Sequence, residues 1–182
     1  MKKNKYILTV ESIIPYPKRM WEEILIYFLE QLEKQKNFSF KHCALTLLVI
    51  KDNDMIFYNQ EQMGVYGPTN ILSFPENDSN AVFLGSNFLG AHVSDTKQAA
   101  VKKQRSELGT LILSMDTLLR EAYVYGQNPH TYAIRLLAHG LVHLLGYEHG
   151  EDMWELTDFL ENSLSAHELL YTFTPFWSFT HG

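Results

Sequence analysis

The spacing of apolar residues along the chain predicts short strands and longer helices. Between positions 18 and 35, apolar side chains recur every three or four residues, which is the spacing of an amphipathic helix. The segment 43–51 is almost continuously apolar and is typical of a strand in the centre of a sheet. By the same patterns we expect further strands at 6–12, 71–75 and 108–114. Further helices are expected at 54–63, 116–125, 130–145 and 151–171.

The order of these elements indicates the fold class. The expected strands lie in the first two thirds of the chain and the long helices come last, which favours an α+β fold with a mixed sheet packed against helices. A length of 182 residues fits a single small domain, 1–182. The segment 76–108 shows no clear pattern; because it is long for a loop, we expect a helix in its latter part. The aromatic residues after position 171 are expected to pack on the core.

The composition of the chain indicates the cellular compartment and limits the kinds of partner that we expect. Cys43 is the one cysteine, so an internal disulfide framework is excluded. The apolar run after the basic N-terminus is too short for a signal peptide, and no stretch of about 18 apolar residues predicts a membrane helix. We therefore expect a cytoplasmic protein with no membrane partner. The net charge of −6 does not by itself favour a nucleic-acid partner.

Three histidines in one short window carry the candidate chemistry. His139 and His143 are four residues apart, so they lie one turn apart on one face of the expected helix. Gly146 lets the chain leave the helix through a left-handed residue, and the following turn can bring His149 back toward the other two. Three imidazoles around one point, with a fourth position open, are typical of a catalytic rather than a structural zinc site. Nickel and copper also suit three imidazoles.

The same window also allows two other interpretations, a pair of core histidines and a metzincin protease. A buried histidine is often a hydrogen-bonded core residue, but here the rest of the helix is apolar nearly all round, and unpaired imidazoles would be costly to bury. The spacing His-x-x-x-His-x-x-Gly-x-x-His is also shared with metzincin proteases, which place a glutamate directly after the first histidine as general base. Here that position is Gly140. A peptidase of that mechanism therefore lacks its base.

The window His-Gly-Leu-Val-His-Leu-Leu-Gly-Tyr-Glu-His, starting at His139, resembles the signature of the YbeY family of bacterial endoribonucleases. The segment Pro-Thr-Asn-Ile-Leu-Ser-Phe-Pro at 68–75 is similar to a second motif of that family. Leu-Gly-Thr-Leu-Ile at 108–112 is similar to its Gly-Asp-Ile strand. The three motifs occur in the family's order, and the resemblance covers about residues 43–165.

The resemblance implies a function. It implies that His139, His143 and His149 bind one metal ion at the end of a buried helix, and that the protein hydrolyses RNA phosphodiesters. A bound metal lowers the pKa of a water and stabilises developing charge. The family acts in maturation of small-subunit ribosomal RNA and in ribosome quality control, so ribosomal RNA and the small ribosomal subunit are the implied partners.

The chain also departs from the family's pattern. Met63 stands in register with an arginine that the family places before the second motif, and Thr110 replaces the aspartate of Gly-Asp-Ile. Without that arginine, a cation suited to phosphate contact is missing. Arg135, one turn before His139, could replace the charge or could pair with a nearby carboxylate. Glu148 could be a general base or a solvated turn residue.

The remaining candidates concern substrate contacts. Asn70 and Ser73, in the second motif, could contact a phosphate, or could be an ordinary turn residue and an ordinary strand residue. A basic run could contact RNA or could be a solvated helix face; it consists of Lys97, Lys102, Lys103 and Arg105. Besides the endoribonuclease, two hypotheses stay open: a non-catalytic ribosome-assembly factor stabilised by its metal, and a metal hydrolase acting on another substrate such as a peptide.

Overall fold

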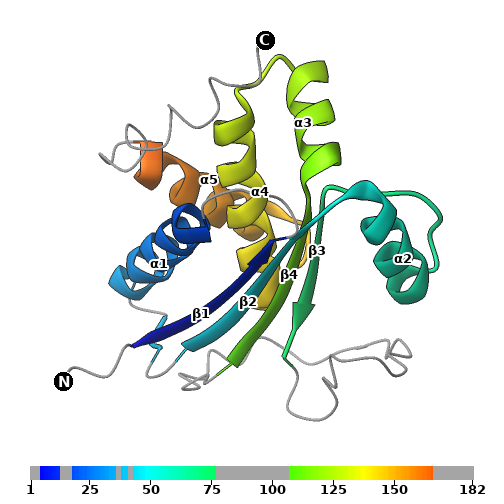
Figure 1. Ribbon diagram of the computed structural model, residues 1–182. Coiled ribbons are helices and arrows are strands. Elements are labelled where there is room, and N and C mark those ends of the chain that lie inside the picture. The colour runs from blue at the N-terminus through cyan, green and yellow to red at the C-terminus, as the bar shows by residue number, and fades with distance from the viewer. Residues whose placement is uncertain (1–4, 13–17, 36–37, 41–42, 77–106, 166–182) are drawn as a thin grey trace.

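The computed structural model describes residues 5–12, 18–35, 38–40, 43–76 and 107–165 (Figure 1). The strands are β1 (Tyr6–Ser12), β2 (Cys43–Ile50), β3 (Ile71–Pro75) and β4 (Glu107–Ser114). The helices are α1 (Lys18–Lys34), α2 (Asp52–Met63), α3 (Met115–Val124), α4 (Pro129–Leu144) and α5 (Glu151–Ser165). Each of these nine elements was expected from the hydrophobic pattern, which confirms the α+β class.

The four strands form one mixed sheet in the order β1-β2-β4-β3. The β1–β2 and β2–β4 pairs are parallel, whereas β3 runs antiparallel to β4 and forms one edge of the sheet. The near-continuous apolar sequence of β2 follows from its central position, since a strand covered on both faces buries both sets of side chains. The mixed sheet predicted from the sequence is therefore confirmed.

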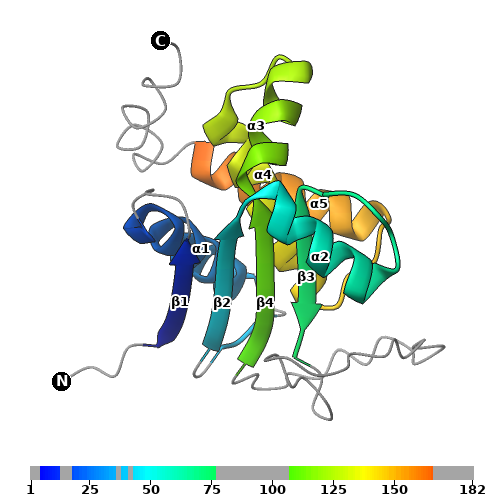
Figure 2. The same ribbon diagram turned by 45° about the vertical axis from the view of Figure 1, so that its right-hand side comes forward.

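The helices cover the two faces of the sheet unequally (Figures 1 and 2). Residues of α1, α4 and α5 join the large core cluster with one face of the strands, including Leu47 and Leu111. On the opposite face, α2 contributes Met55 to a second, smaller cluster with Ile50 and Ile112. The helix α3 continues directly from β4 and packs against α4. The helix α4 thus lies between the sheet, α3 and α5.

Local sequence signals set several element ends. Asn128 caps α4, because its side-chain Oδ1 accepts a hydrogen bond from the backbone N–H of His130 at 2.8 Å, and Pro129 occupies the first helical position. The helix α2 begins at Asp52, two residues before the expected start. The reason is tertiary: the Asp52 carboxylate accepts hydrogen bonds from the Ser114 and Thr117 hydroxyls, both at 2.6 Å. Gly64, with φ of 67°, follows the last residue of α2, so this helix ends at position 63 as expected from the sequence.

Some expectations fall outside the described residues. These are a helix in the latter part of 76–108, the basic run, the last residues of the helix expected to reach 171, and the packing of the aromatic tail. Of the helices that the structure describes, none is long and apolar enough to cross a membrane.

Candidate metal centre

The helix α4 places two imidazoles side by side. His139 and His143 are one turn apart, both half-buried, and their ring centroids are 4.7 Å apart. Most other side chains of this helix are buried, so the helix is held rigidly between the sheet and its neighbours. A rigid helix fixes the spacing of the two nitrogen donors before any ligand binds.

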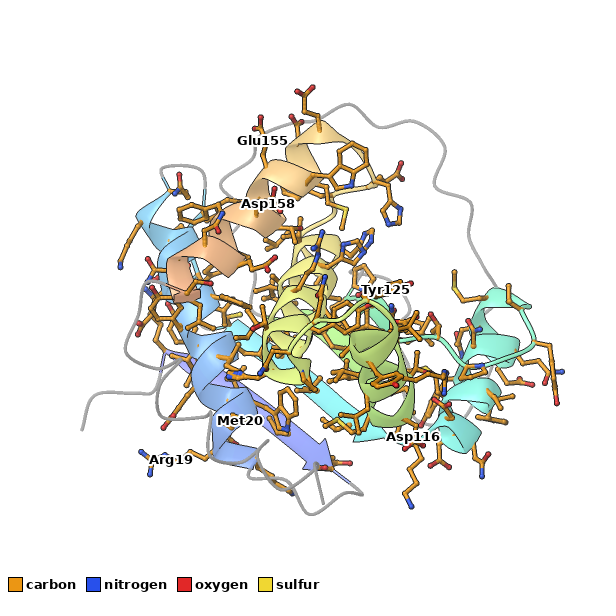
Figure 3. All side chains as sticks on the ribbon, turned by 90° about the horizontal axis from the view of Figure 1, so that it is seen from above. Arg19, Met20, Asp116, Tyr125, Glu155 and Asp158 are labelled. Atoms are coloured by element: carbon orange, nitrogen blue, oxygen red, sulfur yellow. The ribbon has the colours of Figure 1, made fainter. Side chains whose placement is uncertain are left out.

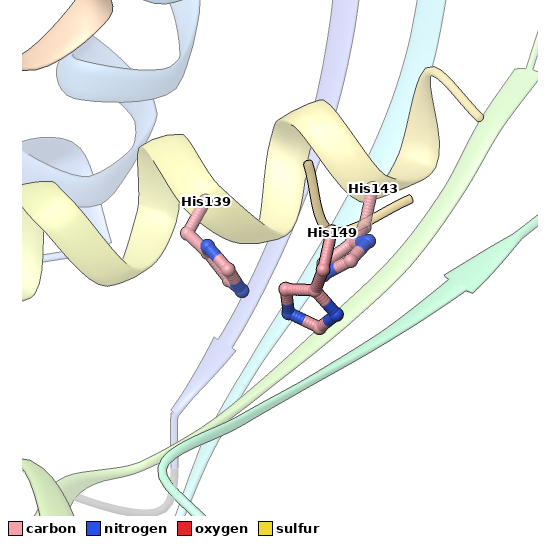
Figure 4. A group of neighbouring side chains, drawn as sticks. All are labelled: His139, His143 and His149. Carbon is pink, nitrogen blue, oxygen red and sulfur yellow. The ribbon is translucent and has the colours of Figure 1, made fainter. Parts of the chain in front are cut away.

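The turn after α4 returns a third imidazole to the same place (Figure 4). Gly146 has φ of 90°, and its N–H donates to the carbonyl oxygen of His143 at 2.9 Å. This left-handed residue reverses the chain, as expected from the sequence. The ring of His149 then lies 5.4 Å from the ring of His139 and 4.7 Å from that of His143. One ligand atom from each of the three lies within 4.8 Å of the others.

A hydrogen bond orients one of these rings. Nδ1 of His143 lies 2.9 Å from the carbonyl oxygen of Tyr147, in the turn. Because a carbonyl can only accept, Nδ1 carries the proton and Nε2 keeps its lone pair. Metal-binding histidines are commonly fixed in this way through their second nitrogen. The turn therefore positions His149 and also selects the tautomer of His143.

The environment favours the neutral form of two of the imidazoles, those of His139 and His143. Burial, with smaller contributions from His143, His149 and Arg135, lowers the pKa of His139 to about 4. Burial also lowers the pKa of His143, although the Tyr147 carbonyl and Glu148 act in the opposite direction. Neutral imidazole is the form that binds a metal ion. A donor set of imidazole nitrogen atoms fits zinc, nickel or copper better than magnesium or calcium.

Gly140 faces the sheet and not the histidines. A Cβ at this position would lie 2.8 Å from Cδ1 of Ile71, 2.9 Å from Cδ2 of Leu111 and 3.2 Å from Oγ of Ser73. The glycine therefore allows α4 to approach β3 and β4 closely. A glutamate here, as in metzincins, would have to point into packed side chains.

Arg135 and Glu148 both lie near the candidate metal centre. Arg135 is exposed on α4, and its charge contributes to the lowered pKa of His139. The same charge acts on Glu161 of α5, whose pKa is raised by burial and partly lowered by Arg135. The charge of Arg135 therefore acts on both His139 and a carboxylate, which is compatible with either role. Glu148 is exposed beside His149 and acts electrostatically on His143.

The surface of α5 next to the centre is acidic. The sequence of α5 contains five carboxylates and no lysine or arginine. Four of these side chains are exposed, among them Glu155 and Asp158 (Figure 3). A polyanion would be repelled along this helix. Approach across α4 and β3 would avoid that repulsion and would meet Arg135.

The two candidates in the second motif have different surroundings. The Asn70 side chain is bonded within the protein: its Nδ2 donates to Glu121 at 2.9 Å, and its Oδ1 accepts from the backbone N–H of Ile71 at 2.7 Å. Ser73 is half-buried on the face of β3 that packs against Gly140. Ser73 lies against Gly140, which directly follows His139 on α4.

The two departures from the family motifs lie away from the histidines. Successive side chains of a strand point to opposite faces of the sheet, so Thr110 and Ile112 of β4 point to the same face. That face is the one covered by α2 and not by α4. Met63 is 60% exposed at the end of α2. Neither residue belongs to the histidine cluster, so neither substitution alters its donor set.

Glu121 and Tyr132, which the sequence does not single out, form a contact at the opposite end of α4 from the histidines. Glu121 on α3 accepts hydrogen bonds from Asn70 and from the hydroxyl of Tyr132 on α4. The one local signal is that Tyr132 precedes His139 by seven residues and so lies on the same helical stripe. Nothing in the sequence indicates its partner on another element.

Comparisons with known proteins agree with this picture. The family model described as endoribonuclease YbeY matches residues 8–163. Proteins named endoribonuclease YbeY are 40% identical over 114 residues in Oleidesulfovibrio alaskensis and 43% identical over 107 residues in Nitratidesulfovibrio vulgaris. These alignments cover 63% and 58% of this chain. They cover 66% and 63% of the two relatives, so the chain spans just under two thirds of the length of each relative.

A third relative and one solved structure extend the match. The protein of the same name from Prochlorococcus marinus, strain MED4, is 29% identical over 164 residues, covering 86% of this chain and 81% of its own length. The solution structure of TM1509 from Thermotoga maritima superposes with a TM-score of 0.53 at 14% identity, over 91% of this chain and 90% of that one. At this identity the likeness concerns the fold.

Proposed function

This chain belongs to the endoribonuclease YbeY family, and on that premise we propose that it is a metal-dependent endoribonuclease with one zinc ion held by His139, His143 and His149. The observation that carries the proposal is the gathering of three imidazoles whose ligand atoms lie within 4.8 Å of one another. The proposed domain is the whole chain, 1–182, and the proposed compartment is the cytoplasm. Nickel or copper would suit the same nitrogen donors.

The residues around the centre have distinct proposed roles. A bound metal ion would supply a water of lowered pKa and a positive charge for the transition state. The Tyr147 carbonyl holds His143 in the tautomer that presents Nε2. Arg135 adds positive charge beside His139, where a phosphodiester would gather negative charge. Glu148 is a candidate proton acceptor, and Ser73 a candidate contact to the substrate.

The proposed substrate is ribosomal RNA, in particular that of the small subunit, because the chain carries the motifs of a family named for RNA cleavage. The alternative is a non-catalytic ribosome-assembly factor that keeps the metal for stability; Met63 and Thr110 at motif positions favour it. A peptide substrate is less well supported, because Gly140 packs against β3 and β4 where a metzincin has its base.

The decisive experiment is single-turnover cleavage of a small-subunit ribosomal RNA precursor, with metal content measured in parallel. We expect weak cleavage by the zinc-loaded protein and none after chelation. Arg135→Ala should slow cleavage roughly tenfold, equivalent to about 1.4 kcal/mol. Met63→Arg restores the family's cation and should accelerate cleavage by adding a phosphate contact away from the histidines; because Met63 is exposed, its replacement disturbs no packing. Both variants should retain their metal.

Two results would change the assignment. Tight binding to the small ribosomal subunit without cleavage, by wild type and Met63→Arg alike, would favour the assembly factor. Cleavage that is unaffected by Arg135→Ala would leave the endoribonuclease standing and remove Arg135 from its mechanism.

A further inference from the structure

One carboxylate oxygen joins three elements of the fold. Oε2 of Glu121, on α3, accepts a hydrogen bond from Nδ2 of Asn70 at 2.9 Å and another from the hydroxyl of Tyr132 at 2.7 Å. Asn70 immediately precedes β3, and Tyr132 is in the first turn of α4. Glu121 therefore holds the start of β3 against the start of the histidine-bearing helix.

The Asn70 end of this connection is firmly attached to the sheet. Its Oδ1 accepts from the N–H of Ile71, and its backbone oxygen accepts from the N–H of Ser114 at 2.8 Å. Within the part of the chain that the structure describes, β3 is an edge strand hydrogen-bonded to β4 alone, so no second strand there fixes its position. The bond from Asn70 to Glu121 supplies a restraint from outside the sheet.

The Tyr132 end is equally well placed. The residue is 7% exposed, and burial together with Glu121 raises the pKa of its phenol to about 12, so it remains a proton donor at neutral pH. Tyr132, His139 and His143 are separated by seven and four residues and share one stripe of α4. The strand β3 follows this helix, because Ile71 and Ser73 lie against Gly140.

These contacts define a β3–α4 seam, formed by Asn70, Ile71 and Ser73 on one side and Tyr132 and Gly140 on the other. Glu121 closes one end of the seam, and the histidines lie toward the other. A shift of β3 along or away from α4 would change the packing at Gly140, which directly follows His139. Small displacements of supporting residues are known to weaken metal sites without removing a ligand.

A second carboxylate, that of Asp52, also links separate elements of the described structure but does not bond to the histidine-bearing helix there. Asp52 accepts hydrogen bonds from the hydroxyls of Ser114 and Thr117 and from Arg120. It joins the start of α2 to the end of β4 and to α3, and among the described residues it bonds to neither β3 nor α4. Asp52 and Glu121 are therefore both carboxylates that link α3 to other elements, and they differ in whether the histidine-bearing helix is one of those elements.

We propose that Glu121 is a positioning residue of the metal centre: by bonding Asn70 and Tyr132 it fixes the β3–α4 seam and so the spacing of the nitrogen donors. The inference rests on the proposed function, because it presumes that His139, His143 and His149 bind a metal. It assigns a new role to Asn70, which acts through Glu121 and not by touching the substrate.

The test measures Co²⁺ affinity and the visible Co²⁺ spectrum of the full chain, under conditions in which each variant is folded. Glu121→Ala should weaken Co²⁺ binding roughly tenfold. Glu121→Gln keeps an acceptor oxygen and Tyr132→Phe removes one donor, so each should weaken Co²⁺ binding by only roughly threefold. The matched control Asp52→Asn should lose stability and keep wild-type affinity. In metal-free protein, amide hydrogen exchange across β3 should accelerate in Glu121→Ala and stay unchanged in Asp52→Asn.

The outcomes separate the two proposals. If wild type binds no Co²⁺, the proposed metal function fails, and the positioning role fails with it. If wild type binds and Glu121→Ala binds equally well, or no more weakly than Asp52→Asn, the positioning role alone is overturned. Should Glu121→Ala not fold, Tyr132→Phe with unchanged affinity and unchanged exchange across β3 would overturn it.

Discussion

The two faces of the central sheet differ in how tightly they are packed and in what they support. On one face, α4 approaches so closely that a single methyl group at Gly140 would overlap Ile71 and Leu111. On the other face, α2 covers a small cluster, and the segment from α2 to β3 exposes Met63 and Tyr66, the latter 82% accessible. The candidate metal centre lies entirely on the first face.

This difference explains why departures from the family motifs need not disturb the histidines. Thr110 belongs to the strand set that faces α2, and Met63 lies at the end of that helix. The ligands and their supporting turn belong to the segment 139–149. We therefore expect substitutions on the α2 face to alter substrate binding or stability, and substitutions on the α4 face to alter the metal centre.

The largest expected effect comes from the α4 face. His139→Ala or His143→Ala should abolish stable metal binding, because two imidazoles remain where three converge. Elemental analysis of purified protein, expected to give about one metal per wild-type chain, measures this. As the matched change on the other face, Thr110→Asp should keep its metal. Unchanged metal content in both histidine variants would disprove the site.

A smaller effect is expected at the closest packing on the same face. Gly140→Ala adds a methyl group against Ile71, Leu111 and Ser73, and overpacking of this kind costs about 1–3 kcal/mol. The better helix propensity of alanine offsets up to about 1 kcal/mol, so a net loss of about 1 kcal/mol is expected. Urea unfolding measures it. Gly150→Ala should be nearly neutral, because its Cβ would make only an ordinary contact, 3.9 Å from the carbonyl oxygen of Glu148; equal effects of the two changes would contradict the close approach.

The smallest effect belongs to the α2 side and depends on pH. Burial raises the pKa of Asp52, but hydrogen bonds from Ser114, Thr117 and Arg120 outweigh it and hold the pKa below its usual value. The folded state thus binds the proton less tightly than the unfolded chain, whose Asp pKa is about 3.9. The extra stability is present above pH about 4 and is lost as the pH falls further.

Asp52→Asn should therefore lower the free energy of unfolding of the metal-free protein by about 0.5 kcal/mol at pH 7, and by progressively less below pH about 4. Urea unfolding at several pH values measures the difference, with the exposed Asp54→Asn on the same helix as control. A cost that is the same at pH 7 and pH 3 would show that the charge of Asp52 is not what stabilises the contact. Metal content should not change in either variant.

The sequence alone predicted every described strand and helix to within a few residues, and it predicted the histidine cluster. These features are local: side-chain periodicity marks helices and strands, a four-residue spacing puts His139 and His143 on one helical face, and Gly146 permits the return turn that brings in His149. The family resemblance rested on the same short windows and was confirmed by the match over residues 8–163.

Only the tertiary structure decided which elements these residues meet. The sequence shows that Gly140 stands where a metzincin has its general base, and the structure adds that this glycine allows α4 to contact β3 and β4. The sequence marks Asn70 as part of a motif, and the structure adds its bond to Glu121, which is 51 residues away in sequence. Thr110 faces away from the histidines because strand alternation and the position of α2 put it there. Such partners come from packing between distant segments, and no local pattern in the chain records which segments will meet.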